Sequence, residues 1–337
     1  MRKFKLLLSL LSILLFTIAC ERNLDTEGPN LSDLYGEFKV IEEFDVSQGT
    51  VAFASGQSVH FTGSFSKIID WKLTITGQAT GAQKVFEGKS RRLDETNTLW
   101  EGETTQLPIF GAEQCIAELS VASDSLQFSK TISIESPKAQ QEALVVADFE
   151  NGWNDDWITF VQSGADMTFN ITDTDPAGEG SFYYDMGGEV DWDWLIGLIE
   201  FPATALGTTT YDLSDNGNNV YFNTMLYLPE GVTNPLLLFQ FSEDENEDGT
   251  FDADSEDMYS VEVRATDLEP GWNLYSIKYS DLAALANGAP VEPNGNGNHE
   301  PNKLSKVSLL YLANPSSGYA QTYMDFVSFT EGEPLKP

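Results

Sequence analysis

The acidic segment from residue 241 to residue 257 has the strongest pattern for chemistry in the chain. Nine of its seventeen residues are acidic and none is basic. Within it, the spacing Asp-x-Asn-x-Asp-Gly places side-chain oxygens on one side of a tight turn, and the glycine permits the bend. The next carbonyl and an acid at the ninth position add further oxygens. The expected calcium ligands are Asp244, Asn246, Asp248, Thr250, Asp252 and Asp257.

This acidic segment differs from a helical EF-hand in two ways. Ser255 stands at the twelfth position, where a bidentate glutamate belongs, so Glu256 or Asp257 must supply the closing carboxylate. The flanks, 236–241 and 258–263, have the pattern of strands and not of helices. The alternative is an acidic, solvated hairpin tip, but so many carboxylates in one loop repel one another unless a cation offsets them. We therefore expect a structural calcium ion in a hairpin loop.

A second segment, 181–198, combines aromatic rings with carboxylates. Trp192 and Trp194 alternate with acids, and residues two apart share one face of a strand. Sugars bind through apolar CH faces, so rings bordered by carboxylates that accept hydroxyl hydrogens suit a glycan. Ile196 and Leu198 continue the same face, so a core position is the alternative for both tryptophans. The candidate sugar-binding residues are Trp192, Trp194 and Tyr184, with Trp153 and Trp157 in a loop nearer the start of this part of the chain.

Composition excludes several classes of function. With 53 acidic and 18 basic residues, the formal charge is −35, which repels phosphate backbones and disfavours anionic polysaccharides but not neutral sugars. The two histidines, His60 and His299, have no partner for a catalytic triad. The sequence also lacks a metal-protease histidine pair, a phosphate-binding loop and a dinucleotide fingerprint. We expect a protein that binds no nucleic acid and is not an enzyme.

The first nineteen residues have the pattern of a secretion signal. A basic start precedes an apolar run, 6–18, that is shorter than the roughly 20 residues of a membrane-spanning helix. The tetrad that ends in Cys20 resembles the bacterial lipobox, although Thr17 stands where leucine is usual. This resemblance implies that Cys20 is lipidated and becomes the mature N-terminus. An ordinary signal peptide with an incidental cysteine is the alternative.

Beyond the signal, the pattern indicates an all-β chain of two sandwiches. Residues 20–35 are polar and aperiodic, as in a flexible tether. Residues 36–137 contain short alternating runs between turns, and they resemble the immunoglobulin-like or PKD-like spacer domains of secreted bacterial proteins. A short polar hinge leads to a second β-rich domain, 142–332.

Two residues in these predicted strands are expected to be buried. Cys115 lies in an alternating run, and with Cys20 lipidated it has no partner for a disulfide. Trp272 lies in an apolar run of the second domain. We therefore expect an inert buried thiol and an indole that belongs to the core.

The order of short motifs in the second domain resembles that of jelly-roll carbohydrate-binding modules. The motifs are Asp148-Phe149-Glu150-Asn151-Gly152 at the start, Gly271-Trp272-Asn273-Leu274-Tyr275 and Leu304-Ser305-Lys306-Val307 later, and Tyr323-Met324-Asp325-Phe326-Val327 at the end. In that family the opening acidic strand and the closing strand lie side by side and often share a structural calcium. The resemblance implies that Asp148 or Glu150, together with Asp325, holds that ion here.

Together, these parts resemble the surface glycan-binding lipoproteins of polysaccharide-utilisation systems of the starch-utilisation type. The resemblance implies a lipid-anchored protein on the outer membrane that faces outward and captures polysaccharide without cutting it. It also implies a TonB-dependent transporter and its own glycan-binding lipoprotein as partners. Because the charge favours a neutral ligand, we expect a β-glucan such as laminarin. The alternatives are a jelly-roll glycoside hydrolase or lyase and a non-sugar surface adhesin.

Overall fold

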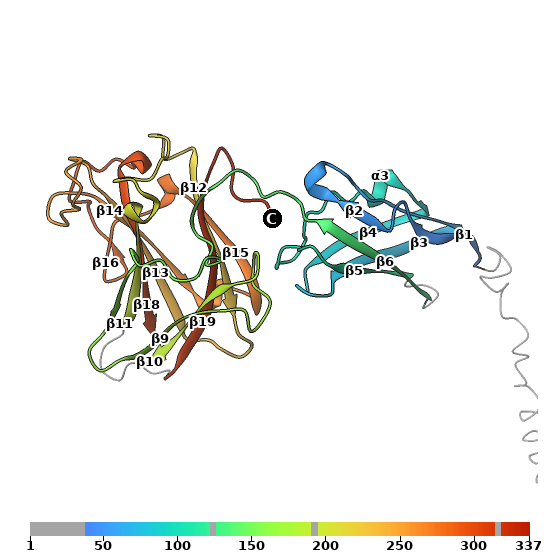
Figure 1. Ribbon diagram of the computed structural model, residues 1–337, viewed down its shortest axis with the longest axis horizontal. Coiled ribbons are helices and arrows are strands. Elements are labelled where there is room, and N and C mark those ends of the chain that lie inside the picture. The colour runs from blue at the N-terminus through green and yellow to red at the C-terminus, as the bar shows by residue number, and fades with distance from the viewer. Residues whose placement is uncertain (1–37, 122–125, 190–194, 314–317) are drawn as a thin grey trace, which may run out of the picture.

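The computed structural model describes residues 38–121, 126–189, 195–313 and 318–337, and their regular structure is almost entirely β (Figure 1). Two β-structured units follow each other along the chain, the first from β1 to β6 and the second from β7 to β19. This confirms the predicted all-β fold of two successive sandwiches. No helix in the described ranges is long and apolar enough to cross a membrane. Cys20 and the predicted tether lie outside these ranges.

The first unit is one hydrogen-bonded network in the order β1-β3-β5-β6-β2, with β4 also paired to β3. The long strand β3 joins its parts, because its first residues pair with β1 and its last residues pair with β5. Cys115 is fully buried in this unit and burial raises the pKa of its thiol to about 12, which confirms the predicted inert cysteine. The elements are β1 (Val40–Val46), β2 (Thr50–Ala52), η1 (Phe53–Ser55), β3 (Phe61–Gly77), β4 (Gln83–Leu93), α3 (Glu95–Thr98), β5 (Gln114–Val121) and β6 (Leu126–Ser136).

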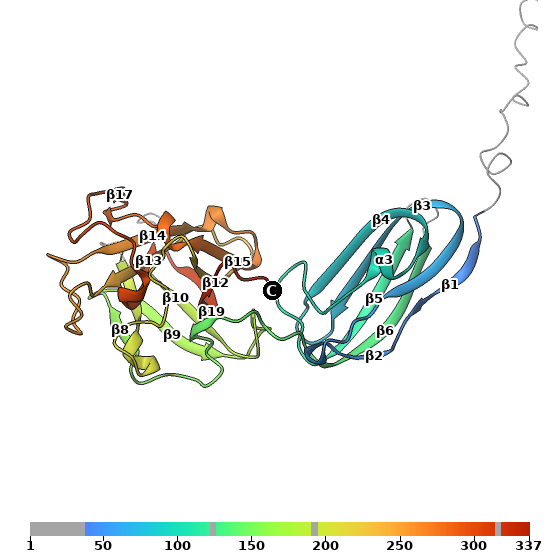
Figure 2. The same cartoon turned by 90° about the horizontal axis from the view of Figure 1, so that it is seen from above.

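The second unit contains two facing antiparallel sheets (Figure 2). We call the sheet in the order β15-β12-β19-β10-β9 the terminal sheet, because the first strand of the unit, β7, pairs with its last, β19, there. Its strands are β7 (Leu144–Ala147), β9 (Asp166–Thr172), β10 (Tyr183–Glu189), β12 (Val220–Leu228), β15 (Gly271–Lys278) and β19 (Ala320–Glu331).

The other sheet of this unit, which we call the opposite sheet, has the order β14-β13-β18-β11-β8. Its strands are β8 (Ile158–Val161), β11 (Leu195–Pro202), β13 (Pro235–Glu243), β14 (Met258–Arg264) and β18 (Leu304–Ala313). A small hairpin and four short helical turns complete the unit: β16 (Leu285–Ala286), β17 (Ala289–Pro290), η2 (Ala203–Leu206), η3 (Ala265–Asp267), η4 (Tyr279–Asp281) and η5 (Pro301–Lys303).

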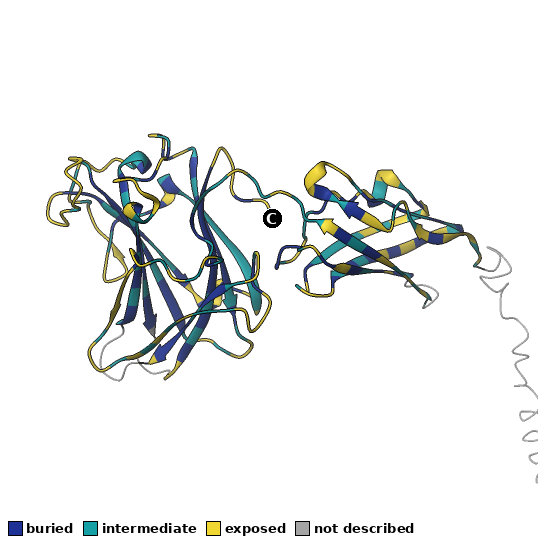
Figure 3. Ribbon diagram, viewed as in Figure 1, coloured by how far each residue is buried: buried dark blue, intermediate teal, exposed yellow. Residues whose placement is uncertain are grey.

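The core of the second unit lies between its two sheets, where alternate strand residues are buried (Figure 3). Phe222 of the terminal sheet, for example, packs on Phe239 and Phe241 of the opposite sheet, with ring centroids 5.1 and 4.9 Å apart. Burial of such rings supplies most of the driving force for folding. The residues between them in each strand point outward, so each sheet has an outer face on which a ligand can lie.

Ile109 of the first unit contacts the outer face of the terminal sheet. The backbone N–H of Ile109 donates to the carbonyl of Gly178, at 2.9 Å. The Ile109 side chain packs in a small apolar cluster with Met225, Phe326 and Leu335. The loop 173–182, which contains Gly178, is therefore held between the two units.

Candidate functional site

A transverse row of side chains crosses the outer face of the terminal sheet. Tyr227 of β12 lies opposite Trp272 of β15 on one side and Tyr323 of β19 on the other. Tyr323 in turn lies opposite Asp185 of β10, and Asp185 lies opposite Asn170 of β9. Tyr227 and Asp185 each lie between two core residues of their strands, so their side chains and those of the cross-strand partners in the row face outward. We call these five residues the aromatic row.

The rings of this row touch one another across the strands. Tyr227 and Tyr323 stack with centroids 4.9 Å apart and planes 15° apart, and the Trp272 ring meets Tyr227 edge-on at 5.4 Å. Tyr183 packs beside them, 4.8 Å from the Tyr323 ring. The Trp272 indole N–H donates to the carbonyl of Pro176, at 2.9 Å, so the loop 173–182 fixes the end of the row. The result is a contiguous aromatic surface that is partly exposed.

The other end of the row is polar and carries an unneutralised carboxylate. Gln321 donates to Asp185 at 3.3 Å, and burial followed by the charge of Asp175 raises the pKa of Asp185. Within the described ranges, neither aspartate takes part in an ion pair. The Tyr319 ring, 50% exposed, lies over Gly187, where an added Cβ would be only 2.3 Å from the Tyr319 hydroxyl oxygen. Glycine at this position therefore lets a further ring extend the aromatic surface.

The predicted sugar-binding residues do not form this row. Tyr184 is a correction, because its side chain is fully buried in the core and stacks on Phe149 at 5.6 Å. Trp192 and Trp194 lie outside the described residues. Trp272, which its apolar strand predicts to be a core residue, is a correction: it is half-buried on the outer face, where it packs against the small apolar cluster that contains Met225.

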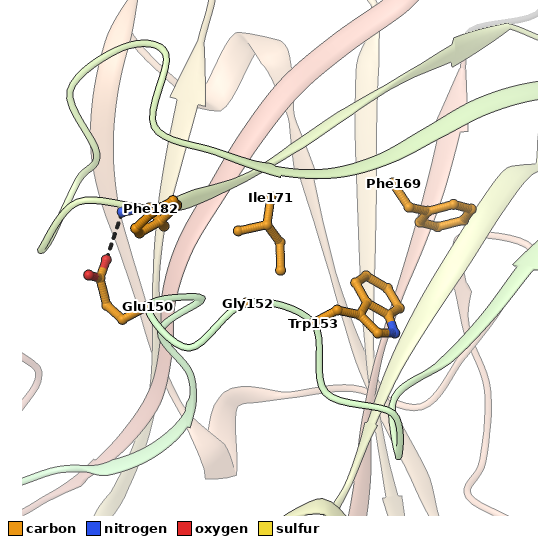
Figure 4. A pocket seen from close by; sticks show the side chains of 6 residues that line it. All are labelled: Glu150, Gly152, Trp153, Phe169, Ile171 and Phe182. Atoms are coloured by element: carbon orange, nitrogen blue, oxygen red, sulfur yellow. Dashed lines mark hydrogen bonds between the residues drawn. The ribbon is translucent and has the colours of Figure 1, made fainter.

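Trp153 and Trp157 lie at a separate apolar pocket of about 460 Å³ (Figure 4). Trp153 is 41% exposed and lines the pocket, whereas Trp157 is only 9% exposed and supports it edge-on, with ring centroids 5.4 Å apart. Figure 4 also shows Glu150 at the rim, where its carboxylate accepts from the backbone N–H of Phe182 at 2.7 Å. The other lining residues are Gly152, Phe169, Ile171 and Phe182.

Glu150 and Asp325, which the family resemblance links to calcium, belong to one group of carboxylates. Asp325 is fully buried, and burial followed by the charges of Glu179 and Glu150 raises its pKa well above the usual value. Burial, followed by the charges of Glu150 and Asp148, raises the pKa of Glu179 as well. Glu179 is not among the residues that the family resemblance indicates. Both carboxylate oxygens of Asp325 accept backbone N–H groups, from Phe326 at 2.7 Å and from Glu179 at 2.8 Å, and among the described residues these acids do not converge as a metal-holding group. A calcium ion held by Asp148 or Glu150 together with Asp325 stays a prediction.

The acidic loop 244–257 forms the turn that its spacing predicts. Asp244 accepts from the N–H groups of Asp248 and Gly249, at 3.2 and 2.8 Å, and Gly249 has a φ of +86°. The closing carboxylate is Glu256, which is buried and accepts from two loop N–H groups, those of Asn246 at 3.1 Å and Asp252 at 2.8 Å. The other predicted ligands, Asn246, Asp248, Thr250 and Asp252, are exposed.

Asp257, the other candidate for closing the loop, has its hydrogen bonds outside the acidic loop. Its two carboxylate oxygens accept from the N–H groups of Gly295 and Gly297, at 2.6 and 2.7 Å, in a different loop. Glu256 lies in a bend before β14 begins, and its carboxylate and that of Asp257 accept from different loops. A calcium ion in the acidic loop stays a prediction.

Comparison with known proteins gives likenesses at the level of fold. No family model and no curated protein matches the chain. Among solved structures, one reported under "promiscuous specificity of the carbohydrate-binding modules from the beta-sandwich super family" has 13% identity and a TM-score of 0.39, covering 88% of this chain and 99% of that one.

Two other solved structures represent different kinds of protein. A protein described as "SGBP-B from a complex xyloglucan utilization locus in Bacteroides uniformis" has 12% identity and a TM-score of 0.33, covering 87% of this chain and 73% of that one. An enzymatically active tailspike domain of bacteriophage CBA120 has 11% identity and a TM-score of 0.31, covering 55% and 20%. Glycan-binding and enzymatic proteins thus both occur among the similar structures, and no family is assigned.

Proposed function

We propose that this protein binds a neutral polysaccharide on the aromatic row and does not cut it. The observation that carries this proposal is the contiguous line Trp272, Tyr227, Tyr323 across three adjacent strands, continued by Asp185 and Asn170. Along this line, the apolar ring surfaces at one end are followed by hydrogen-bond acceptors at the other. That combination suits a sugar, which has apolar CH faces and a rim of hydroxyl groups.

The charge around the row supports a neutral ligand. Asp185 and Asp175 lie beside it, and the row itself contains no lysine or arginine. An anionic glycan would bring its carboxylates or sulfates against these aspartates, and the overall charge of −35 adds to that repulsion. A sugar hydroxyl, in contrast, can donate to Asp185.

The length of the row supports a chain of sugars over a single one. Neighbouring strands are about 4.8 Å apart, so a row across five strands extends over about 19 Å. By analogy with bases on aromatic side chains, each stacked ring contributes about 1 to 3 kcal/mol. A repeating polymer offers many equivalent segments to such a surface, which favours capture even when each contact is weak.

The finer parts of the proposal concern the ligand and the cellular setting. We take a β-glucan such as laminarin as the first ligand to test. Lipidation at Cys20 would hold the protein on the outer membrane facing outward, where it could pass glycan to a TonB-dependent transporter and its own glycan-binding lipoprotein. These parts rest on the signal segment and on the family resemblance.

Calorimetry of the protein from residue 20, with Cys20→Ser, tests the proposal against laminarin, mixed-linkage glucan, mannan, xylan and alginate. We expect heat with at least one neutral polymer, none with alginate, and no release of reducing sugar. Trp272→Ala should weaken binding, whereas Trp153→Ala, at the separate pocket, should not. Tightest binding to alginate would contradict the neutral ligand. Release of reducing sugar would favour a hydrolase, and no heat with any polymer would favour a non-sugar adhesin.

A further inference from the structure

Three carboxylates from two distant segments meet at the end of β13. Glu243 is the last residue of β13, Glu245 follows two positions later, and Glu300 comes from the loop that precedes η5. Each offers one carboxylate oxygen, and these three oxygens lie within 4.8 Å of one another. We call them the glutamate triad.

Glu243 is the buried member of this triad, and only one of its two carboxylate oxygens accepts hydrogen bonds within the described ranges. The residue is fully buried, and its Oε1 accepts from the Tyr279 hydroxyl at 2.8 Å and from the Glu300 N–H at 2.9 Å. Its Oε2 is buried and has no hydrogen-bond partner among the residues that the structure describes. An unpaired oxygen of a buried carboxylate is strongly destabilising unless a proton or a cation satisfies it.

The surrounding loop is organised around these carboxylates by its backbone. The N–H of Asn296 donates to Glu245 at 3.1 Å, and Gly295 and Gly297 donate to Asp257, which lies beside the triad. Within the described ranges, no lysine or arginine forms an ion pair with any of these four acids, and the nearby Lys303 pairs with Glu247. The site therefore gathers like charges and leaves them without a counter-charge.

We propose that the glutamate triad binds a calcium ion that fastens the loop 293–300 to the end of β13. The ligands are all carboxylate oxygens, whereas zinc and copper prefer sites with sulfur or nitrogen ligands. His299 lies nearby, but its Nε2 is within hydrogen-bonding distance of the Leu282 carbonyl, at 2.9 Å, and its ring stacks on Tyr259. Three carboxylates, with waters or carbonyls completing the shell, match the six to eight oxygens of calcium better than the few carboxylates and retained waters of magnesium.

The triad shares none of its three ligands with the calcium site that the sequence indicates in the acidic loop. Glu243 and Glu245 each contribute an oxygen to the triad, whereas Asp244 between them accepts hydrogen bonds inside the acidic loop. The site also lies away from the aromatic row, because it belongs to the end of the opposite sheet. Calcium binding here and glycan binding there can therefore succeed or fail independently.

A calcium titration of the chelator-treated protein, measured by calorimetry, tests the proposal. The pair Glu245→Gln with Glu300→Gln keeps the shape of both side chains and removes two ligand charges. We expect it to bind one fewer equivalent of calcium than the wild type. The matched control, Glu269→Gln with Glu292→Gln, removes the same charge from exposed positions and should keep every equivalent. Wild-type stoichiometry and affinity in the triad pair would overturn the proposal.

Thermal melting in chelator separates loss of the ion from loss of the fold. Without calcium, the triad pair should melt at a higher temperature than the wild type, because the mutual repulsion of the carboxylates is removed. With calcium, it should gain less from the ion than the wild type does. If the pair does not fold, Glu245→Gln alone, at a half-buried position, serves the same test. A calcium-induced rise in melting temperature equal to that of the wild type would count against the site.

Discussion

The centre of the aromatic row gives the sharpest test of glycan binding. Tyr323 stacks on Tyr227 at 4.9 Å, packs on Tyr183 at 4.8 Å and lies opposite Asp185, so Tyr323→Ala interrupts the row in its middle. If one stacked ring contributes about 1 to 3 kcal/mol, its loss weakens binding by about 5-fold to 150-fold. Calorimetry against the best neutral polymer measures this change directly.

The same substitution should leave the protein folded, because Tyr323 lies on an outer face. The two lost ring contacts are together worth about 1 to 3 kcal/mol, less than the roughly 5 to 15 kcal/mol that separate folded from unfolded domains. Tyr323→Phe is the matched variant, since it keeps the ring and removes one hydroxyl, and its affinity should stay within about tenfold of the wild type. A folded Tyr323→Ala protein with unchanged affinity, together with loss of binding in Trp153→Ala, would refute the reasoning and favour the pocket of Figure 4.

Three further predictions concern other parts of the chain. Asp185→Asn should weaken glycan binding and yet raise the melting temperature at pH 7, because the pKa of Asp185 is raised in the folded state and its ionisation therefore disfavours folding. Melting at several pH values should show that this gain vanishes below the ordinary pKa of 3.8. Cys20→Ala should move the protein from the membrane fraction to the soluble fraction, and wild-type protein that is soluble and unmodified at residue 20 by mass spectrometry would contradict lipidation. If the acidic loop binds calcium, Asp248→Ala should reduce the drop in melting temperature that chelator causes. The stabilisation lost corresponds to up to about 2.7 kcal/mol at a hundredfold excess of calcium over Kd, and an unchanged drop would remove the loop as a site.

The fold was predictable because burial in these strands follows the sequence residue by residue. In β3 the buried positions alternate with partly exposed ones over much of its length, and the apolar residues Phe61, Phe65, Leu73 and Ile75 occupy the buried ones. Alternation of this kind is local, so a single sequence contains it. The same property made the buried state of Cys115 predictable.

The aromatic row was not predictable because it depends on pairing between distant segments. Trp272, Tyr227, Tyr323 and Asp185 come from four strands, and only the register of those strands brings them into one line. Spacing along the chain contains no such register, and the apolar residues around Trp272 predict a core position. The local pattern that indicated a sugar-binding site was the cluster of acids and tryptophans in 181–198. Most of that cluster lies in residues that the structure does not describe.

The acidic loop shows the same limit on a smaller scale. Its Asp-x-Asn-x-Asp-Gly spacing predicts the turn, and the hydrogen bonds of Asp244 confirm it. The choice between Glu256 and Asp257 depends on which way each side chain points at the start of β14, and on a loop almost forty residues later that offers its N–H groups to Asp257. The N–H of Glu300 reaches Glu243 across 57 residues of sequence, so neither contact has a local signature.

The strand that carries the centre of the row also carries the buried carboxylate of the terminal sheet. Asp325 lies two residues after Tyr323 on β19, on the same outer face, and accepts from the N–H of Glu179 at 2.8 Å. Glu179 belongs to the loop 173–182, whose Pro176 carbonyl holds the Trp272 indole. The loop is thus tied to β19 through the Glu179 N–H and to β15 through the Pro176 carbonyl, so both contacts set the position of Trp272. Because an ordered platform binds with a smaller entropic penalty than a mobile one, this anchoring of the loop favours sugar binding on the row.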